Sequence, residues 1–211
     1  AVKLFEPEQL KVFNELPADS INADIQETFT QLADDKSKPS QKTVELLRAK
    51  TFRGWPTKEN SLNAKRAFST EYEGVVFEAI DFDSQEHIRL RAYIAYRKGL
   101  EKPSRVDVEV LNEEYWNKYL KLGRPAFADV WGEELKLAKI KADAPVTDKE
   151  QQAIEKRMAG VRKGDVVFVA FMPRGFGLSA MTQDERHITH LRRRFMLLGQ
   201  TLAGMQVWDV R

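Results

Sequence analysis

The stretch KGDVVFVAFMPRGFGLS, residues 163 to 179, decides the fold. Val166 to Met172 are seven consecutive apolar residues, which is typical of a strand buried on both faces in a parallel sheet. Gly175 and Gly177 follow this strand and allow a sharp turn or a close backbone approach. We therefore expect Val166 to Met172 to be the central strand of the sheet, followed by a tight turn.

Three earlier segments alternate with period two and predict further strands. They cover Gly74 to Phe82, Ile88 to Tyr96 and Val106 to Val110. The turn between the first two is expected at residues 83–86. In the third, valines alternate with Asp107 and Glu109, and this charged face indicates a position near a sheet edge or under a polar cover.

Helices are predicted around the last two strands. The region from Glu113 to Trp131 is expected to be helical, and Thr147 to Glu150 form a capping box that opens a helix ending near Gly160. The last helix is predicted from one apolar stripe at spacings of three and four, formed by Ile188, Leu191, Phe195, Leu198, Leu202 and Met205. No stop signal precedes Arg211, so we expect the chain to end inside this helix.

The first third of the sequence has helical patterns and no strand run. Ile21, Ile25, Phe29 and Leu32 follow Ser20 at helical spacing, and a second helix is expected over Thr43 to Lys50. We interpret residues 1–70 as a helical N-terminal extension or cap and residues 71–211 as a partial α/β domain. The glycine and proline in Thr51 to Pro56 break the helical pattern, and this segment is expected to dock on the sheet.

Composition excludes several function classes. The 211 residues include 34 basic and 32 acidic side chains, and this balance gives no reason to expect nucleic acid or an anionic membrane as a partner. Cysteine is absent, which excludes disulfides, thiolate metal sites and a cysteine nucleophile. No apolar run approaches 18 residues, so a membrane span is not expected. The start at Ala1 favours a periplasmic or secreted protein, with the cytoplasm as the alternative.

Two formal motifs lack the context that their chemistry requires. Gly175 to Ala180 fits G-x-G-x-x-A, but a dinucleotide site needs a helix starting at the glycines, whereas the apolar helical stripe starts near Ile188. His187 and His190 are spaced to share a helix face, yet no acidic residue completes a metal-binding spacing, and Arg192 to Arg194 would repel a cation. We expect no metal and no cofactor, and we assign this arginine run to a solvated face, not to a nucleic-acid site.

Four stretches carry a resemblance to a known family: Thr51 to Pro56, Asp81 to Gln85, Pro173 to Gly177, and RRRFMLLGQTLAGMQVWDVR from Arg192 to Arg211. Together they resemble bacterial α/β-hydrolases of the group that contains acetyl xylan esterases and prolyl-oligopeptidase-related enzymes. The order of the predicted elements matches the N-terminal half of an α/β-hydrolase sheet, with two antiparallel-type strands before parallel strands and helices. The resemblance covers the chain from about residue 50 onward.

The resemblance implies a serine carboxylic-ester hydrolase, acting on acetylated polysaccharide or a small ester, whose catalytic serine, acid and histidine all follow Arg211. No serine in this sequence lies in G-x-S-x-G, so we expect no catalytic residue in the chain and an inactive isolated fragment. The loop after the third strand would supply one oxyanion-hole amide, with Glu114 or Tyr115 as candidates. Arg174, with Gly175 and Gly177, would organise the turn after the fourth strand.

Other interpretations stay open. The loop at residues 112–115 lacks the glycine-rich form common in esterases, and Pro173 replaces an aspartate found in many relatives, which favours a non-catalytic binding or scaffolding protein on a degenerate hydrolase fold. The 211 residues could also be a stable proteolytic product. A half-sheet would expose the edge of the Val166 to Met172 strand and the apolar stripe of the last helix, so we expect either a dimer or a missing C-terminal segment that covers them.

Overall fold

The computed structural model describes residues 41–50, 52–56, 58, 61–182 and 184–211. The chain forms two compact units, with the boundary between Glu45 and Leu46. Of the first unit only residues 41–45 are described, as the start of helix α2 (Gln41–Lys50), which confirms the helix predicted over Thr43 to Lys50. The helix predicted after Ser20 lies outside the described residues.

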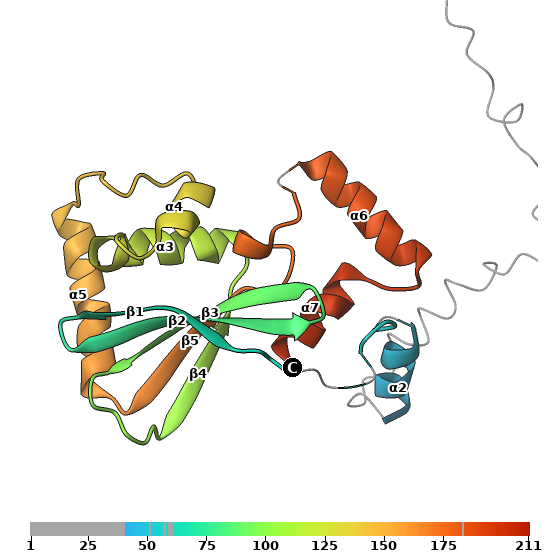
Figure 1. The fold of residues 1–211 in the computed structure, drawn as a ribbon, viewed down its shortest axis with the longest axis horizontal. Helices are drawn as coiled ribbons and strands as arrows, with labels where there is room; N and C mark the ends of the chain where they lie inside the picture. Colours follow the sequence, from blue (N-terminus) through green and yellow to red (C-terminus); the bar gives the residue numbers. More distant parts are fainter. Residues whose placement is uncertain (1–40, 51, 57, 59–60, 183) are drawn as a thin grey trace, which may run out of the picture. The chain divides into compact units, whose positions relative to one another are not determined.

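The second unit is a mixed α/β fold with a five-stranded sheet (Figure 1). Its strands are β1 (Lys65–Tyr72), β2 (Val75–Gln85), β3 (Ile88–Arg97), β4 (Arg105–Val110) and β5 (Val166–Phe171). Their order in the sheet is β1-β2-β3-β5-β4, with β4 and β5 parallel and all other neighbours antiparallel. The helices are α3 (Glu113–Phe127), α4 (Gly132–Leu137), α5 (Asp148–Lys163), α6 (Glu185–Leu197) and α7 (Leu202–Val210).

The sheet begins earlier than the sequence indicated. Lys65 to Tyr72 form strand β1, so the expectation that residues 1–70 contain no strand is wrong for this segment. Phe68 and Tyr72 are its only large apolar residues, and they pack against the core. A two-residue turn with positive φ at Glu73 (47°) and Gly74 (77°) joins β1 to β2, as in a type I′ hairpin.

Helices cover one face of the sheet. Helices α3, α4 and α5 contribute Trp116, Leu120, Phe127, Leu135, Ile154, Met158 and Val161 to a core that they share with residues from β2, β3 and β5. The capping box opens α5 as predicted, because the Thr147 hydroxyl accepts from the Glu150 amide and the Glu150 carboxylate accepts from the Thr147 amide. The helix continues past Gly160 to Lys163.

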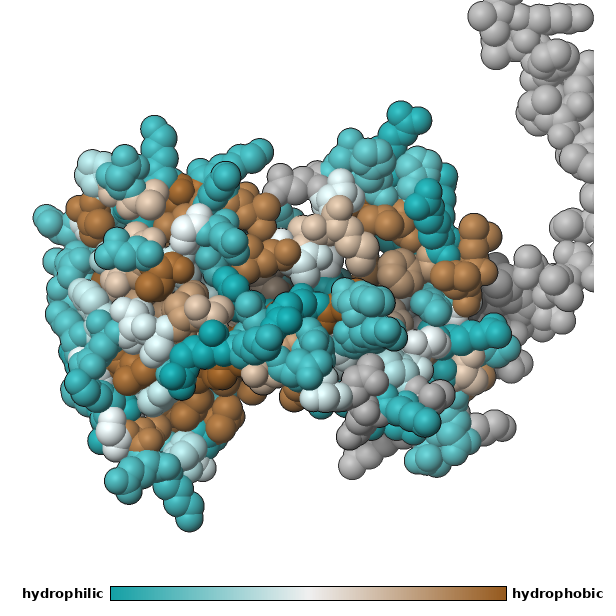
Figure 2. Space-filling model, in the orientation of Figure 1, coloured by the Kyte–Doolittle hydropathy of each residue, from teal (hydrophilic) through white to brown (hydrophobic). Residues whose placement is uncertain are grey.

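The opposite face keeps exposed valines on β4. Val106, Val108 and Val110 have 52%, 59% and 46% of their surface exposed, and Figure 2 shows apolar patches over this part of the sheet. Strand β4 is one of the two edge strands, which is the first of the two positions that its charged face indicated. Strand β5 is paired on both sides, by β3 and β4, so the expectation that it would be the exposed strand is wrong. It is an interior strand, but second from the edge and not central.

The last predicted helix is in fact two helices. Helix α6 ends at Leu197, Gly199 adopts a φ of +68°, and Thr201 caps α7 by accepting a hydrogen bond from the Gly204 amide at 2.9 Å. Only glycine enters this left-handed conformation without strain, so Gly199 ends one helix and Thr201 starts the next. None of the helices in the described part of the chain reaches the length and apolarity that crossing a bilayer requires.

Candidate functional site

A buried ion pair joins the turn after β5 to the last helix. The Arg174 side chain is 4% exposed and that of Asp209 is fully buried. The guanidinium donates from Nη2 to Asp209 Oδ1 at 2.5 Å and from Nε to Oδ2 at 2.9 Å, and the Arg174 amide donates to Oδ2 at 2.8 Å. Several hydrogen-bond donors converge on the Asp209 carboxylate, and this pairing offsets the free-energy cost of burying its charge.

The end of β2 completes this network. A register shift between Asp83 and Gln85 marks a bulge at Ser84, and bulges leave one residue unpaired in the ladder. The Ser84 hydroxyl donates to Asp209 at 2.5 Å, and its carbonyl accepts from Trp208 Nε1 at 2.9 Å. Gln85 Oε1 accepts from Arg174 Nη1 at 3.0 Å. The turn expected at residues 83–86 is therefore mostly strand, and the chain reverses at Glu86 and His87 instead.

The Phe52 to Trp55 segment contacts the same region. Trp55 Nε1 donates to the carbonyl of Gly204 at 2.8 Å, its ring stacks on Phe52 at 4.8 Å, and it lies 5.6 Å from the Trp208 ring. These contacts are with α7, whereas docking on the sheet was expected. The structure thus places parts of all four stretches that carried the family resemblance in one contiguous cluster, with Arg174 at its centre.

A cavity of about 480 Å³ lies where β4 and β5 end. Both parallel strands run towards it, and ligands of open α/β sheets bind outside the carboxyl ends of the strands. The first turn of α3 contributes Glu113 and Trp116, and Gly175 and Gln206 connect its wall to the Arg174 network. Glu185 and Arg192 of α6 add charged groups. We call this space the carboxyl-end cavity.

Trp116 carries an unused hydrogen-bond donor beside this cavity. The residue is 3% exposed, and its Nε1 has no acceptor among the described residues. It lies between the carboxyl-end cavity and an adjoining cavity of about 200 Å³. A buried N–H without an acceptor costs free energy, and a ligand oxygen or a water molecule would remove that cost.

Charged residues line the adjoining cavity. Arg91 donates from Nε to Asp81 at 2.6 Å and from Nη1 to Glu134 at 2.9 Å, and the Tyr93 hydroxyl donates to Glu134 at 2.8 Å. Burial, with the negative Glu134 beside it, raises the pKa of Tyr93 well above its usual value. The hydrogen bond to Asp81 raises the pKa of Arg91, so the guanidinium stays charged. Each charge has a partner, and the cluster fixes α4 on β3.

The two oxyanion candidates lie on the first turn of α3 but do not line either of these cavities. The Tyr115 amide donates to Asn112 Oδ1 at 2.9 Å, so the helix cap already uses it. Tyr115 is 54% exposed. The Glu114 carboxylate pairs with Lys118 at 2.6 Å, and this hydrogen bond lowers its pKa. The Glu114 amide occupies a position where a helix provides no internal acceptor.

No serine–histidine pair forms among the described residues. Ser179 donates to the carbonyl of Phe176 at 2.9 Å, and Gly177 has a positive φ of 51°. His187 and His190 are exposed on α6, and the described residues hold no cluster of three or more His, Cys, Asp or Glu that could bind a metal. Dinucleotide binding also lacks support, because the 3₁₀ turn from Gly177 to Ser179 separates the glycines from α6.

Sequence reasoning did not find Trp116, Arg91 or Glu134. Trp116 is as buried as a core tryptophan, but its free donor depends on what surrounds the ring. Arg91 and Glu134 are 43 positions apart. The available signal was weak: Arg91 is a charged residue inside a predicted strand, and Glu134 lies next to the apolar Leu135.

Comparison with known proteins finds a distant structural likeness. No family model and no curated protein matches the chain. A crystal structure described as a putative acetyl xylan esterase from Bacteroides fragilis NCTC 9343 superposes with a TM-score of 0.45 at 14% sequence identity. The match covers 78% of this chain and 38% of that one, so the chain spans well under half the length of that protein.

Proposed function

We propose that this chain forms the ligand-binding part of a carboxylic-ester hydrolase, with acetylated polysaccharide or a small ester as the ligand. The observation that carries the proposal is the cluster around Arg174. The four sequence stretches that together resemble this enzyme class meet in this cluster, and two of them, residues 173–177 and 192–211, also contribute to the lining of the carboxyl-end cavity. A resemblance carried by segments that are distant in the sequence but in contact in the fold is stronger support than a resemblance in a single segment.

Two donors near the cavity have a chemical role in this proposal. Trp116 Nε1 donates to an ester oxygen. The Glu114 amide follows Glu113, which lines the cavity, and it is the candidate oxyanion donor because the Tyr115 amide is already used. Helix N-termini favour negative charge, which develops on the carbonyl oxygen when a nucleophile attacks. Arg174 acts through position: it holds the turn that carries Gly175 and Gly177.

The nucleophile in this proposal comes from outside residues 1–211. Ser179 is held by backbone carbonyls, and no described histidine is placed to activate a serine. A serine supplied from elsewhere, with its own histidine and acid, would form an acyl-enzyme that water then hydrolyses. Residues 1–211 alone therefore bind an ester and do not turn it over.

Activity measurements test this division of roles. We expect no turnover of p-nitrophenyl acetate and no fluorophosphonate labelling with residues 1–211, and both with an intact protein that contains them. Labelling of a serine within residues 1–211 would contradict the proposed source of the nucleophile. An intact protein that does not hydrolyse esters would instead support a second function, a non-catalytic binding protein, which the engaged Ser179 and the capped Tyr115 amide favour.

A further inference from the structure

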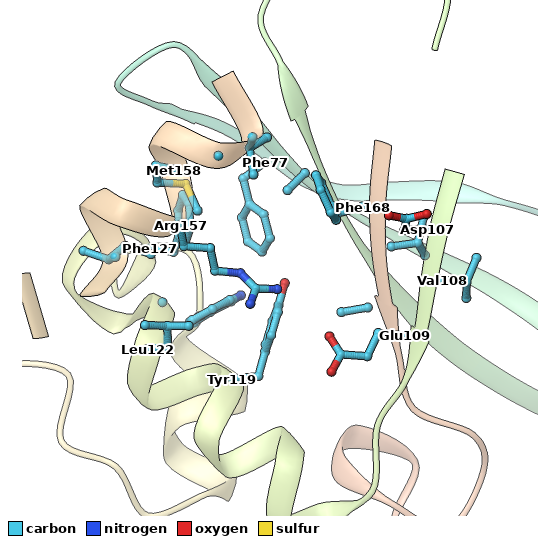
Figure 3. Close-up of a pocket in the computed structure, with 18 residues that line it drawn as sticks. Phe77, Asp107, Val108, Glu109, Tyr119, Leu122, Phe127, Arg157, Met158 and Phe168 are labelled. Carbon is cyan, nitrogen blue, oxygen red and sulfur yellow. The ribbon is translucent and has the colours of Figure 1, made fainter. Parts of the chain in front are cut away.

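A third cavity, separate from the two beside Trp116, lies between the sheet and helices α3 and α5 (Figure 3). Its volume is about 330 Å³, and aromatic rings from both layers line it, including Phe77, Phe127, Trp131 and Phe168. We call it the inter-layer cavity. Trp116 is not among its lining residues, and Trp131 does not line the carboxyl-end cavity.

The size and lining of this cavity suit a small apolar molecule. A water molecule takes about 30 Å³ in the liquid. A methylene group is of similar size, so the space holds about ten non-hydrogen atoms, at the lower end of the range for ligand pockets. Phe77, Phe127 and Trp131 are at most 3% exposed and belong to the core, so they form an apolar wall for the body of a ligand, whereas Glu109, Arg157 and Gly160 are exposed and lie at the open side of the cavity.

One side of the cavity is polar and carries a positive charge, a negative charge and a hydroxyl group. Tyr119, Arg157 and Glu109 meet there, and Figure 3 shows Arg157 reaching into the cavity towards Tyr119, with Glu109 across from it. The Arg157 guanidinium lies 6.0 Å from the centre of the Tyr119 ring. Neither Arg157 nor Glu109 has an ion-pair partner among the described residues. Burial raises the pKa of Tyr119, which keeps its hydroxyl protonated and able to donate.

We infer that the inter-layer cavity binds a neutral amphipathic molecule, with an aliphatic or aromatic body of about ten heavy atoms and a hydroxyl head. The head accepts from Arg157 or Tyr119 and donates to Glu109. A carboxylate head would gain Arg157 but meet Glu109 as a like charge, and an ammonium head would gain Glu109 but meet Arg157 in the same way. The attraction and the repulsion offset each other, and an ion also loses hydration on binding, so the cavity favours the uncharged head.

Two measurements on the 211-residue chain test this inference. The first is displacement of the neutral fluorophore N-phenyl-1-naphthylamine by octan-1-ol, octanoate and octylammonium. We expect octan-1-ol to compete at least ten-fold better than either ion. Glu109→Gln should improve octanoate selectively, and Arg157→Gln should improve octylammonium selectively. Equal competition by all three heads, or failure of the fluorophore to bind, overturns the inference.

The second measurement locates the ligand. Trp131 and Trp116 give separate indole N–H signals in a ¹⁵N-correlated NMR spectrum, and each is assigned by substitution with phenylalanine. Octan-1-ol should shift the Trp131 signal and leave Trp116 unchanged. A shift of Trp116 alone would place the ligand in the carboxyl-end cavity and contradict the inference, without bearing on ester binding there.

Gly160 offers a matched pair of variants. A Cβ at this position of α5 meets no atom within 4 Å, and the residue lines the cavity. Gly160→Phe should fill the space and weaken fluorophore binding at least ten-fold. Gly160→Ala should keep binding within two-fold, since it adds one methyl group and favours the helix. Thermal unfolding of both variants checks that they fold, and unchanged binding in a folded Gly160→Phe variant would overturn the inference.

Discussion

The Asp209→Asn substitution tests the buried network most severely. Asp209 accepts from Ser84 and from both the side chain and the amide of Arg174, and its side chain is fully buried. Removing its charge leaves the Arg174 guanidinium buried with only neutral partners, Gln85 and Ser84. Breaking a buried pair on one side costs about 3–5 kcal/mol. Domains have only about 5–15 kcal/mol of stability in total.

The expected loss is large enough to measure without ambiguity. For a chain of this size, about 2–4 °C accompany each kcal/mol, so the unfolding midpoint should fall by roughly 6–20 °C. Thermal unfolding followed by tryptophan fluorescence is a suitable assay, because Trp208 donates to Ser84 beside the pair. As a matched control, Glu114→Gln removes an exposed ion pair and should leave the midpoint unchanged.

A double variant separates charge from packing. Arg174→Met with Asp209→Leu removes both charges and keeps apolar volume, so it should recover most of the stability lost in Asp209→Asn. An Asp209→Asn variant within about 1 kcal/mol of the parent, below the cost of any buried unpaired charge, would refute the reasoning. The Arg174 network would then be peripheral to the fold.

Three further outcomes follow from local geometry. Gly199→Ala should destabilise by about 1–2 kcal/mol in urea unfolding, because φ is +68° and a Cβ would lie 3.0 Å from Arg53 Nη1. Thr147→Ala removes the α5 cap and should cost about 1 kcal/mol by the same assay, with Thr147→Ser nearly neutral. The raised pKa values of Tyr93 and Tyr119 mean that the unfolded chain ionises first, so stability present below pH 10.0, the ordinary tyrosine value, should fall as pH rises above it. Stability that stays flat there would contradict the pKa directions.

Local patterns in the sequence predicted what depends on local chemistry. The apolar run at Val166 to Met172 gave a strand, and Thr147 with Glu150 gave a capping box, because both signals need no distant partner. Strand β1 was missed because Phe68 and Tyr72 alone gave too weak an alternation. The break at Gly199 was visible in principle, since Thr201 is a suitable N-cap, but the apolar stripe passes through both helices.

Pairing across the sheet was harder to predict, because it depends on contacts between distant residues. The sequence of β5 does not indicate which strand pairs with it on either side. In the structure its neighbours are β3 and β4, and β4 forms one edge of the sheet. The same holds for the site. Arg174 and Asp209 were each inside a quoted stretch, but their contact spans 35 positions and is set by the fold. The free donor of Trp116 depends on its surroundings and has no sequence signal.

The indole N–H of Trp116 provides the most direct test of ester binding in the carboxyl-end cavity. Residues 1–211 are titrated with a small acetate ester or an acetylated xylo-oligosaccharide, and the indole N–H signals are followed by NMR. Trp116 should shift saturably, as its free donor gains an acceptor, while Trp55 and Trp208, already bonded to backbone carbonyls, stay in place. A Trp116 signal that does not move at saturating ester would contradict the account.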